Sequence, residues 1–218
     1  MSRAAVQNGR AAAGARERIL DAADALFGEL GFDAASTREI AERSGVNKAL
    51  IHYHFKNKDG LLLQVLDRYY DQLAATLLAA LAAGADLRDK LLRLVDGYVD
   101  FLAANRGFLR IVQREASGGH HMDLVHARTE PLFATGIELL QQAYPATRGG
   151  DMDAAQLLTS VYGMIITYFT YDGVLGRLLG ADPLAPAGLA ARKRHLHHLI
   201  EVLLADIAEP AAAVEEEP

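Results

Sequence analysis

The sequence predicts an all-α fold, and two kinds of observation lead to this prediction. Alanine and leucine dominate the chain of 218 residues, tryptophan and cysteine are absent, and only six prolines occur. Alanine and leucine favour helices, whereas proline ends them. Apolar residues also recur at the spacing of one helix face, as in Leu87, Leu91, Leu94, Val95, Tyr98 and Leu102. A chain of this length can hold one sizeable helical domain and a smaller one.

The first predicted helix covers residues 16–30 and ends at Gly31. Residues 1–15 include Arg3 and Arg10 but no apolar segment, so we expect a flexible basic N-terminal arm and not a secretory signal. The apolar face of the helix comprises Ile19, Ala23, Leu26, Phe27 and Leu30.

A second, short helix is predicted to begin at Ser36 or Thr37. Either side chain can cap a helix, and Glu39 lies three residues after Ser36, where it completes a capping box. Ile40 and Ala41 fall on the inner face of this helix, and the small Ala41 allows another helix to cross closely over it.

The segment that follows predicts a helix-turn-helix. Gly45 stands where the chain must turn and a Cβ would be costly, and Val46 and Ile51 supply apolar contacts between the two helices. An ordinary pair of packed helices is the alternative, but the basic and aromatic outer face favours DNA. That face is formed by Asn47, Lys48, Ala49, His52 and Tyr53.

The run from Arg16 to about Leu66 resembles the DNA-binding domain of TetR/AcrR-type transcriptional regulators. The features that carry the resemblance are Gly31-Phe32 after the opening helix, Thr37 with Ile40-Ala41, the turn Gly45–Lys48, the aromatic cluster Tyr53–Phe55, and Lys56–Asp59. The close resemblance covers about a quarter of the chain. It implies a transcriptional regulator, most often a repressor, and not an enzyme.

The resemblance also implies how this domain meets double-stranded DNA. The helix of residues 47–54 is expected to enter the major groove, with Ala49 and Leu50 packing on bases and with Thr37, Tyr53 and Lys58 holding phosphates. A tyrosine is more usual at the position of His52, so a phosphate contact is not implied there. The expected DNA-binding residues are Thr37, Asn47, Lys48, Ala49, Leu50, His52, Tyr53, His54 and Lys58.

Six further helices are predicted in the rest of the chain. Their ranges are 58–83, 86–104, 108–116, 122–144, 151–179 and 188–207, with a loop at 145–150. Asn57 is expected to cap the first of them, and Pro131 to kink or break the fourth. Residues 209–218 are acidic and contain proline, which predicts a disordered acidic tail.

These elements predict a helix-turn-helix DNA-binding domain at residues 16–62 and a helical effector-binding and dimerisation domain at residues 63–208. The net charge of −6 arises after residue 68, because residues 1–68 hold ten Lys and Arg against nine Asp and Glu, whereas the remainder holds twelve against nineteen. A net acidic protein can still bind DNA, because phosphates are neutralised locally. The candidates for a basic face are Arg10, Arg16, Lys48, Lys56 and Lys58.

The resemblance implies a small-molecule effector pocket inside the C-terminal bundle. Tyr162 and Tyr168 place hydroxyl groups in an apolar segment, and buried hydroxyls need partners from the protein or a ligand. Such a pocket suits an apolar or aromatic effector, although core packing is the alternative for each residue. The candidates are Tyr98, Phe101, Phe108, Met122, Phe133, Tyr162, Ile165, Tyr168 and Phe169.

A homodimer is expected, because one recognition helix reads only a few base pairs and a palindromic operator offers two half-sites. The helices 151–179 and 188–207 are the expected interface, with Ala155 and Gly163 allowing close approach. The alternative is that the apolar stripe of the second helix closes the core of its own subunit. That stripe comprises Leu196, Leu199, Ile200 and Leu203.

Other functional classes find little support. There is no cysteine, no glycine-rich phosphate loop after a strand and no evident pair of nucleophile and base, so neither an enzyme nor a cofactor is expected. Metal binding is not expected either, because the histidine spacings fit a metal site poorly. The histidines in question are His120, His121 and His126 in one group and His195, His197 and His198 in another, where only the spacing of His195 and His198 would suit two ligands one helical turn apart.

The segment 154–171 carries no charge but is interrupted by polar residues, so a membrane span is not expected. The absence of cysteine fits the reducing cytoplasm. Two alternatives to a ligand-responsive regulator remain: an effector-independent DNA-binding or architectural protein, and a helical enzyme or scaffold that keeps the motif.

Overall fold

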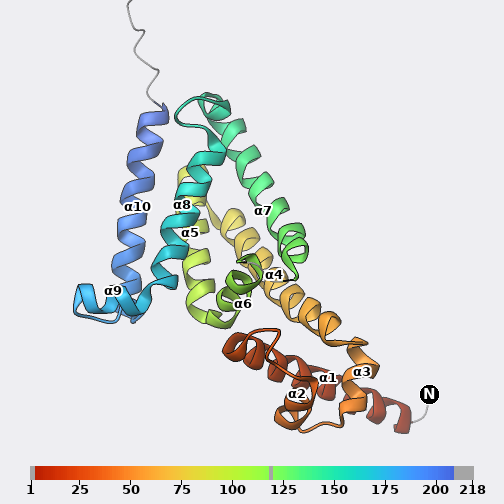
Figure 1. Ribbon diagram of the computed structural model, residues 1–218. Coiled ribbons are helices and arrows are strands. Elements are labelled where there is room, and N and C mark those ends of the chain that lie inside the picture. Colours follow the sequence, from red (N-terminus) through yellow and green to blue (C-terminus); the bar gives the residue numbers. More distant parts are fainter. Residues whose placement is uncertain (1–2, 118–119, 209–218) are drawn as a thin grey trace, which may run out of the picture. The chain divides into compact units, whose positions relative to one another are not determined.

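The structure is a computed structural model that describes residues 3–117 and 120–208. Within these residues the regular elements are all helical, as predicted (Figure 1). In chain order they are α1 (Arg3–Leu30), α2 (Thr37–Ser44), α3 (Lys48–Phe55), α4 (Lys58–Ala83), α5 (Leu87–Ala104), α6 (Arg106–Ala116), α7 (Met122–Ala143), the 3₁₀ helix η1 (Pro145–Arg148), α8 (Ala154–Thr170), α9 (Asp172–Leu179) and α10 (Pro186–Ala208).

The described residues form two compact units. The first extends to Ala74 and resumes at Ala104–His126, whereas the second contains Ala75–Ala103 and the chain from Ala127 onward. Besides residues 16–62, the first unit contains α6 and the first part of α4, which pack with α1. Helix α4 contributes residues to both units.

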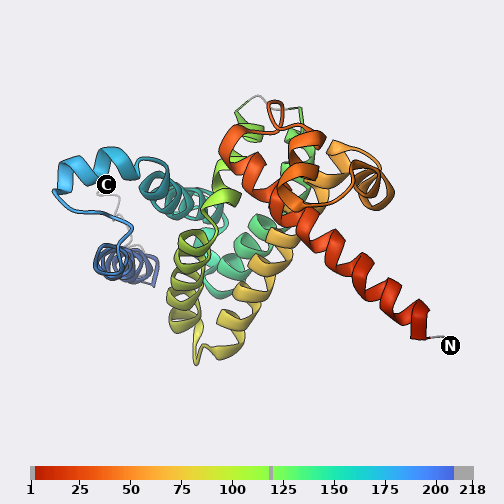
Figure 2. The ribbon, with the colours of Figure 1, turned by 90° about the horizontal axis from the view of Figure 1, so that it is seen from below.

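The first unit is built around α1, which runs past α2 and α3 in Figure 2. Helices α1 and α6 approach each other closely at Gly28 and Gly107: a Cβ on Gly28 would lie 3.3 Å from the Cα of Gly107. Two glycines at this crossing let the backbones meet. The fully buried side chains of this unit include Ile19, Phe27, Ile40, Ile51, Leu61, Leu62, Val65 and Leu66.

The second unit packs α5, α7, α8 and α10 together, and α10 runs antiparallel to α8 (Figure 1). Polar contacts join α10 to α5: Lys193 bonds Asp100 at 2.7 Å, and His197 meets Asp96 at 2.8 Å. The apolar core below these contacts includes Val95, Val99, Leu102, Ile165, Leu196 and Ile200.

Helix α4 has the predicted range of 58–83, and its first turn is capped as expected. The Asn57 Oδ1 atom accepts a hydrogen bond from the Gly60 amide at 2.8 Å. Helix α1 begins at Arg3, where a flexible arm was expected. The alanine-rich sequence before Arg16 explains the extension, because alanine has the highest helix propensity.

The prediction of one helix over 151–179 is wrong, because the chain divides at Tyr171 into α8 and α9. Tyr171 leaves helical geometry with φ −103° and ψ 25°, and the Asp172 Oδ1 atom accepts a bond from the Gly173 amide at 2.7 Å. Gly173 and Gly176 also weaken the helix that would otherwise continue.

Two further predictions concerned segments that contain a proline. Helix α7 continues through Pro131 without a break, so a break is excluded there. Residues expected to form a loop after Pro145 form η1, in which proline occupies the first turn and lacks only an amide that would be unpaired anyway. The predicted tail, 209–218, lies outside the described residues.

Candidate nucleic-acid interface

Helix α2 begins and ends as its sequence predicts. The Ser36 hydroxyl accepts a bond from the Glu39 amide at 3.2 Å, and the Glu39 carboxylate accepts one from the Ser36 amide at 2.9 Å. This reciprocal pair is the predicted capping box. Gly45 then takes a left-handed conformation, φ 65° and ψ 32°, which glycine adopts without steric cost.

Helix α3 follows the turn and has two distinct faces. The Asn47 Oδ1 atom caps it by accepting a bond from the Ala49 amide at 2.9 Å. Ile51 and Phe55 are buried, with 2% and 4% of their surface exposed. A helix anchored by these two side chains must point its opposite face outward.

The outward face of α3 carries four of the predicted DNA-binding residues. Lys48, Ala49 and His52 are exposed, and 79% of the Tyr53 surface is accessible. Asn47 is also exposed, although its side chain already caps the helix. Thr37, on α2, and Leu50 are half-buried.

His54 does not share this exposure. Its ring lies against those of Tyr53 and Phe55, with centroid distances of 5.0 and 6.0 Å. Its Nε2 atom is buried and has no hydrogen-bond partner within the described part of the chain. The side chain is therefore half-buried and packs against its neighbours in the unit.

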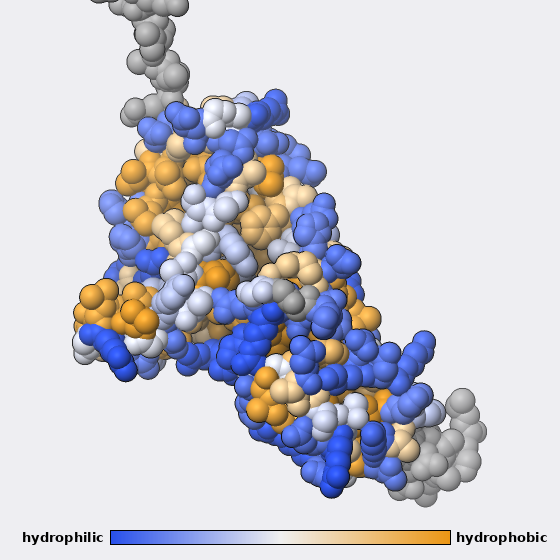
Figure 3. Space-filling view, in the orientation of Figure 1, coloured by the Kyte–Doolittle hydropathy of each residue, from blue (hydrophilic) through white to orange (hydrophobic). Residues whose placement is uncertain are grey.

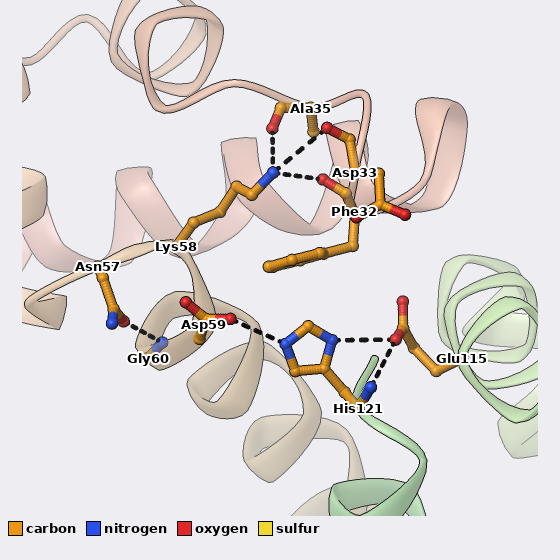
Figure 4. A network of polar contacts seen from close by, with 9 residues as sticks. All are labelled: Phe32, Asp33, Ala35, Asn57, Lys58, Asp59, Gly60, Glu115 and His121. Carbon is orange, nitrogen blue, oxygen red and sulfur yellow. Dashed lines mark hydrogen bonds and ion pairs between the residues drawn. The ribbon is translucent and has the colours of Figure 1, made fainter. Parts of the chain in front are cut away.

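Lys58 also has an internal role in this structure (Figure 4). Its ammonium group donates to the carbonyl oxygens of Phe32, Asp33 and Ala35 at 2.8, 3.3 and 3.1 Å. It also lies 4.3 Å from the centroid of the Phe32 ring. An ammonium group has three protons, and here all three are used to fasten α4 to the segment before α2.

A polar cluster joins α4 to α1 in the same unit. The Tyr69 hydroxyl lies 2.6 Å from each Asp24 carboxylate oxygen, and Arg68 contacts both Asp24 and Asp21. Burial and the bond to Asp24 raise the pKa of Tyr69 well above its usual value, so its hydroxyl stays protonated and donates. These contacts hold the helices that support α2 and α3.

A cavity of about 130 Å³ lies in the second unit. Its wall is aliphatic throughout, with residues from α5, α7, α8 and α10. Such a wall offers apolar contact area but no hydrogen bond to a bound molecule. The lining residues are Leu91, Leu94, Val95, Leu140, Leu157, Leu158, Val161, Ile200, Leu203, Leu204 and Ile207.

Comparison with known proteins agrees with both units. Residues 19–65 match the family described as bacterial regulatory proteins, tetR family. Residues 88–200, about half of the chain, match the tetracyclin repressor-like C-terminal domain. The chain belongs to the TetR family.

Individual TetR-family relatives show the same relationship. The transcriptional activator FasR of Mycolicibacterium smegmatis is 35% identical over 128 residues, which are 59% of this chain and 54% of FasR. The class A tetracycline repressor of Escherichia coli is 28% identical over 201 residues, 91% of this chain and 84% of the repressor. The chain spans about half the length of FasR and of two further curated relatives.

The solved structures confirm the TetR-family fold. The fatty acid degradation regulator FadR of Bacillus halodurans superposes with a TM-score of 0.68 at 20% identity, covering 90% of this chain and 97% of FadR.

The cavity described above is lined by none of the nine residues predicted for the effector pocket. Phe108 lies in the first unit, where its ring packs 5.2 Å from Tyr69 and 5.3 Å from Tyr70. Met122 belongs to the same unit and is 43% exposed. Neither residue lines the cavity described above.

The other seven residues belong to the second unit, and four of them, Tyr98, Phe133, Tyr162 and Tyr168, are half-buried. Phe101, Ile165 and Phe169 are buried. Tyr162 stacks on Tyr98 at 6.3 Å. Phe133 meets the Tyr162 ring at 5.2 Å, and Tyr168 meets Phe169 at 6.2 Å.

The two tyrosine hydroxyls that suggested a ligand have protein partners. Burial raises the pKa of Tyr162, and a hydrogen bond with Tyr98 partly offsets this. The Tyr168 hydroxyl donates to the Pro183 carbonyl at 3.0 Å. The leucines, valines and isoleucines that line the cavity show only the helical spacing that core residues also show, so their positions in the sequence do not mark a cavity.

The described ranges contain no group of three His, Cys, Asp or Glu side chains that fits a metal ion. No helix in them is long and apolar enough to cross a membrane.

Proposed function

We propose that this protein is a cytoplasmic, ligand-responsive transcriptional repressor that binds a palindromic operator as a homodimer. The observation that carries the proposal is the division of α3 into a buried face, Ile51 and Phe55, and an exposed face with Lys48 and Tyr53. A short helix held in this way can enter the major groove with its outer side chains.

The exposed residues of α3 would contact different parts of the DNA. Lys48 would neutralise a phosphate or reach a guanine, Ala49 would pack on a thymine methyl, and Tyr53 would hold a phosphate. His52 has the exposure to reach a base edge. His54 and Lys58, which contact their own unit, would support the fold of the DNA-binding domain.

Thr37 and Leu50, both half-buried, stand at the edge of this surface. Thr37 is the first residue of α2. The N-terminus of a helix favours a negative charge, so a phosphate would suit this position. Leu50 would add apolar contact beside Ala49.

The aliphatic cavity supports a small apolar effector. A cavity of about 150 Å³ with apolar walls can hold a molecule the size of benzene, and the cavity here measures about 130 Å³. Its walls provide no polar anchor, so a short aliphatic chain or a small ring would be selected by shape and apolar area.

Exposed apolar residues support the homodimer. Val174, Leu178 and Leu179 on α9 and Val202 on α10 are each more than half exposed. Figure 3 shows an orange apolar group over α9. Leu196 and Ile200 of the predicted stripe are buried in their own subunit, so the interface would use the neighbouring positions of α10.

The DNA-binding part of the proposal is tested with a fluorescent duplex taken from upstream of the protein's own gene. Lys48→Ala should weaken binding to this duplex and to unrelated DNA, and should reduce the slope of log affinity against log salt by about 1. Lys90→Ala, a lysine of the second unit, is the matched control and should match the wild type. Equal salt slopes for Lys48→Ala and wild type would exclude the proposed contact.

The effector part is tested in the same assay with straight-chain alcohols of increasing length. A ligand that binds only the DNA-free form lowers DNA affinity in proportion to its preference for that form. Val161→Phe, which fills the cavity, should remove the response and leave DNA affinity without alcohol unchanged. DNA affinity that no apolar probe alters in the wild type would favour an effector-independent DNA-binding protein.

A further inference from the structure

His121 lies at the start of α7 between two carboxylates from different helices (Figure 4). Its Nε2 atom is 2.9 Å from Asp59 Oδ1 on α4, and its Nδ1 atom is 3.0 Å from Glu115 Oε2 on α6. The His121 amide also donates to Glu115 Oε2 at 3.3 Å. All three residues belong to the first unit, and we refer to them as the His121 cluster.

The cluster is shielded from solvent on most sides. The side chain of Glu115 is 6% exposed and that of His121 is 13% exposed, whereas that of Asp59 is 62% exposed. The Phe32 ring covers the imidazole edge-on, with a centroid distance of 4.4 Å and an interplanar angle of 72°. A carboxylate as buried as Glu115 is costly unless a cation and hydrogen bonds compensate it.

With both carboxylates ionised, the geometry is satisfied by only one protonation state of His121. An ionised carboxylate accepts hydrogen bonds and cannot donate them, and a neutral imidazole has only one N–H. Either neutral tautomer would therefore place a nitrogen lone pair about 3 Å from a carboxylate oxygen. The imidazolium ion donates to both oxygens at once.

The pKa values of His121 and Asp59 are shifted in the directions that an ion pair between them requires. Burial by itself lowers the pKa of His121, but the hydrogen bonds to Asp59 and Glu115 outweigh it, and the pKa lies above its usual value. The bond from His121 lowers the pKa of Asp59.

We infer that the His121 imidazolium is a positioning group for DNA binding: it holds the first turn of α4, which directly follows the recognition helix α3, against the C-terminal end of α6. Only Lys56 and Asn57 separate the two helices. A displacement of Asp59 would therefore also displace Phe55, the last buried residue of α3. The inference goes beyond the proposed function, because it adds a pH-dependent restraint to the DNA-binding unit.

The direction of the pH dependence follows from linkage. Since the folded pKa of His121 is raised, its contribution is complete below about 6.5 and is lost as pH rises through the folded value. Since the folded pKa of Asp59 is lowered, its contribution fails only in acid, as pH falls through that value. The restraint should therefore weaken on the alkaline side of neutrality.

Other charged groups near the cluster do not replace His121. Lys58 lies across the Phe32 ring from the imidazole and is engaged by backbone carbonyls. Arg114 of α6 donates to the Glu29 carbonyl at 3.5 Å. On the segment of His121 itself, the neighbouring titratable groups are His120 and Asp123, both exposed.

The test uses the full-length protein without DNA, so its result does not depend on the proposed operator. Nitrogen NMR of ¹⁵N-histidine-labelled protein should show both His121 ring nitrogens protonated at pH 6.5, with a pKa above 6.5. Amide exchange of residues 58–62, corrected for intrinsic rate, should then accelerate as pH rises through that pKa. Each unit by which the pKa is raised should give about a tenfold loss of protection.

Two variants separate charge from simple packing. His121→Gln should give weak protection of residues 58–62 at every pH, whereas His120→Gln, its exposed neighbour, should follow the wild type. A neutral His121 at pH 6.5 would overturn the inference. Amide protection of residues 58–62 that does not change with pH in the wild type would also overturn the inference. This measurement does not depend on the folding of any variant.

Discussion

Tyr69 shows how one buried hydroxyl joins two helices of the DNA-binding unit. The residue is 7% exposed, and its oxygen lies 2.6 Å from both carboxylate oxygens of Asp24 on α1. Burial raises the pKa of Asp24, and the bonds from Tyr69 and Arg68 partly offset this. A carboxylate in such a site depends on its remaining donors.

Tyr69→Phe should lower the free energy of unfolding by about 1–3 kcal/mol, because Asp24 keeps its partial burial and loses a donor. Urea unfolding followed by circular dichroism measures the change. Tyr53→Phe, at a position 79% exposed, serves as the control and should change stability little. If the two variants proved equally stable, the Tyr69–Asp24 contact would contribute nothing to the fold.

At the scale of helices, the crossing of α1 and α6 explains why α6 belongs to the first unit. Gly28 is buried, and a Cβ there would meet the Gly107 Cα at 3.3 Å. A Cβ on Gly107 would approach Asp24 and Tyr69 at 3.4 Å. The same few residues therefore contain the helix crossing and the polar contact between α1 and α4.

Gly28→Leu should destabilise the protein by about 1–3 kcal/mol, because the larger side chain must push α6 away from α1. Gly14→Leu is the matched control on the same helix, where an added Cβ would meet only the end of Arg18 at 3.8 Å. Thermal unfolding compares the two. A loss of stability in the control as large as in Gly28→Leu would point to α1 itself and not to the crossing.

At the scale of the whole molecule, the exposed apolar surface of α9 and α10 is the feature that a single subunit leaves unexplained. Leu178 and Val174 are 77% and 63% exposed, and Val202 on α10 is 53% exposed. Clustered apolar exposure of this kind is typical of protein–protein interfaces. A two-fold interface would pair this surface with itself and give two recognition helices.

Leu178→Asp combined with Val202→Asp should convert a dimer into a monomer in sedimentation velocity at micromolar concentration. Operator affinity should then fall about a thousandfold or more, toward the non-specific level. Leu78→Asp, equally apolar and 65% exposed on α4, should leave both measurements unchanged. A wild-type protein that sediments as a monomer would remove the basis for this prediction.

Local sequence signals predicted most of the helices and the helix-turn-helix. The capping box of Ser36 and Glu39, the left-handed Gly45 and the cap at Asn57 were all predicted correctly. Each depends on the chemistry of residues within a few positions of one another, which the sequence displays directly. The exposed set on α3 followed from the helical spacing of its anchors.

Contacts between distant residues decided the rest, because tertiary packing brings together side chains that no local pattern relates. Phe108 packs with Tyr69, and the cavity is lined mainly by leucines whose spacing is that of any core. His121 meets Asp59 from 62 positions away. The sequence determined which segments are helices and which face of α3 is free, whereas only the tertiary structure decided which buried polar groups meet, where space remains and which charges must coexist.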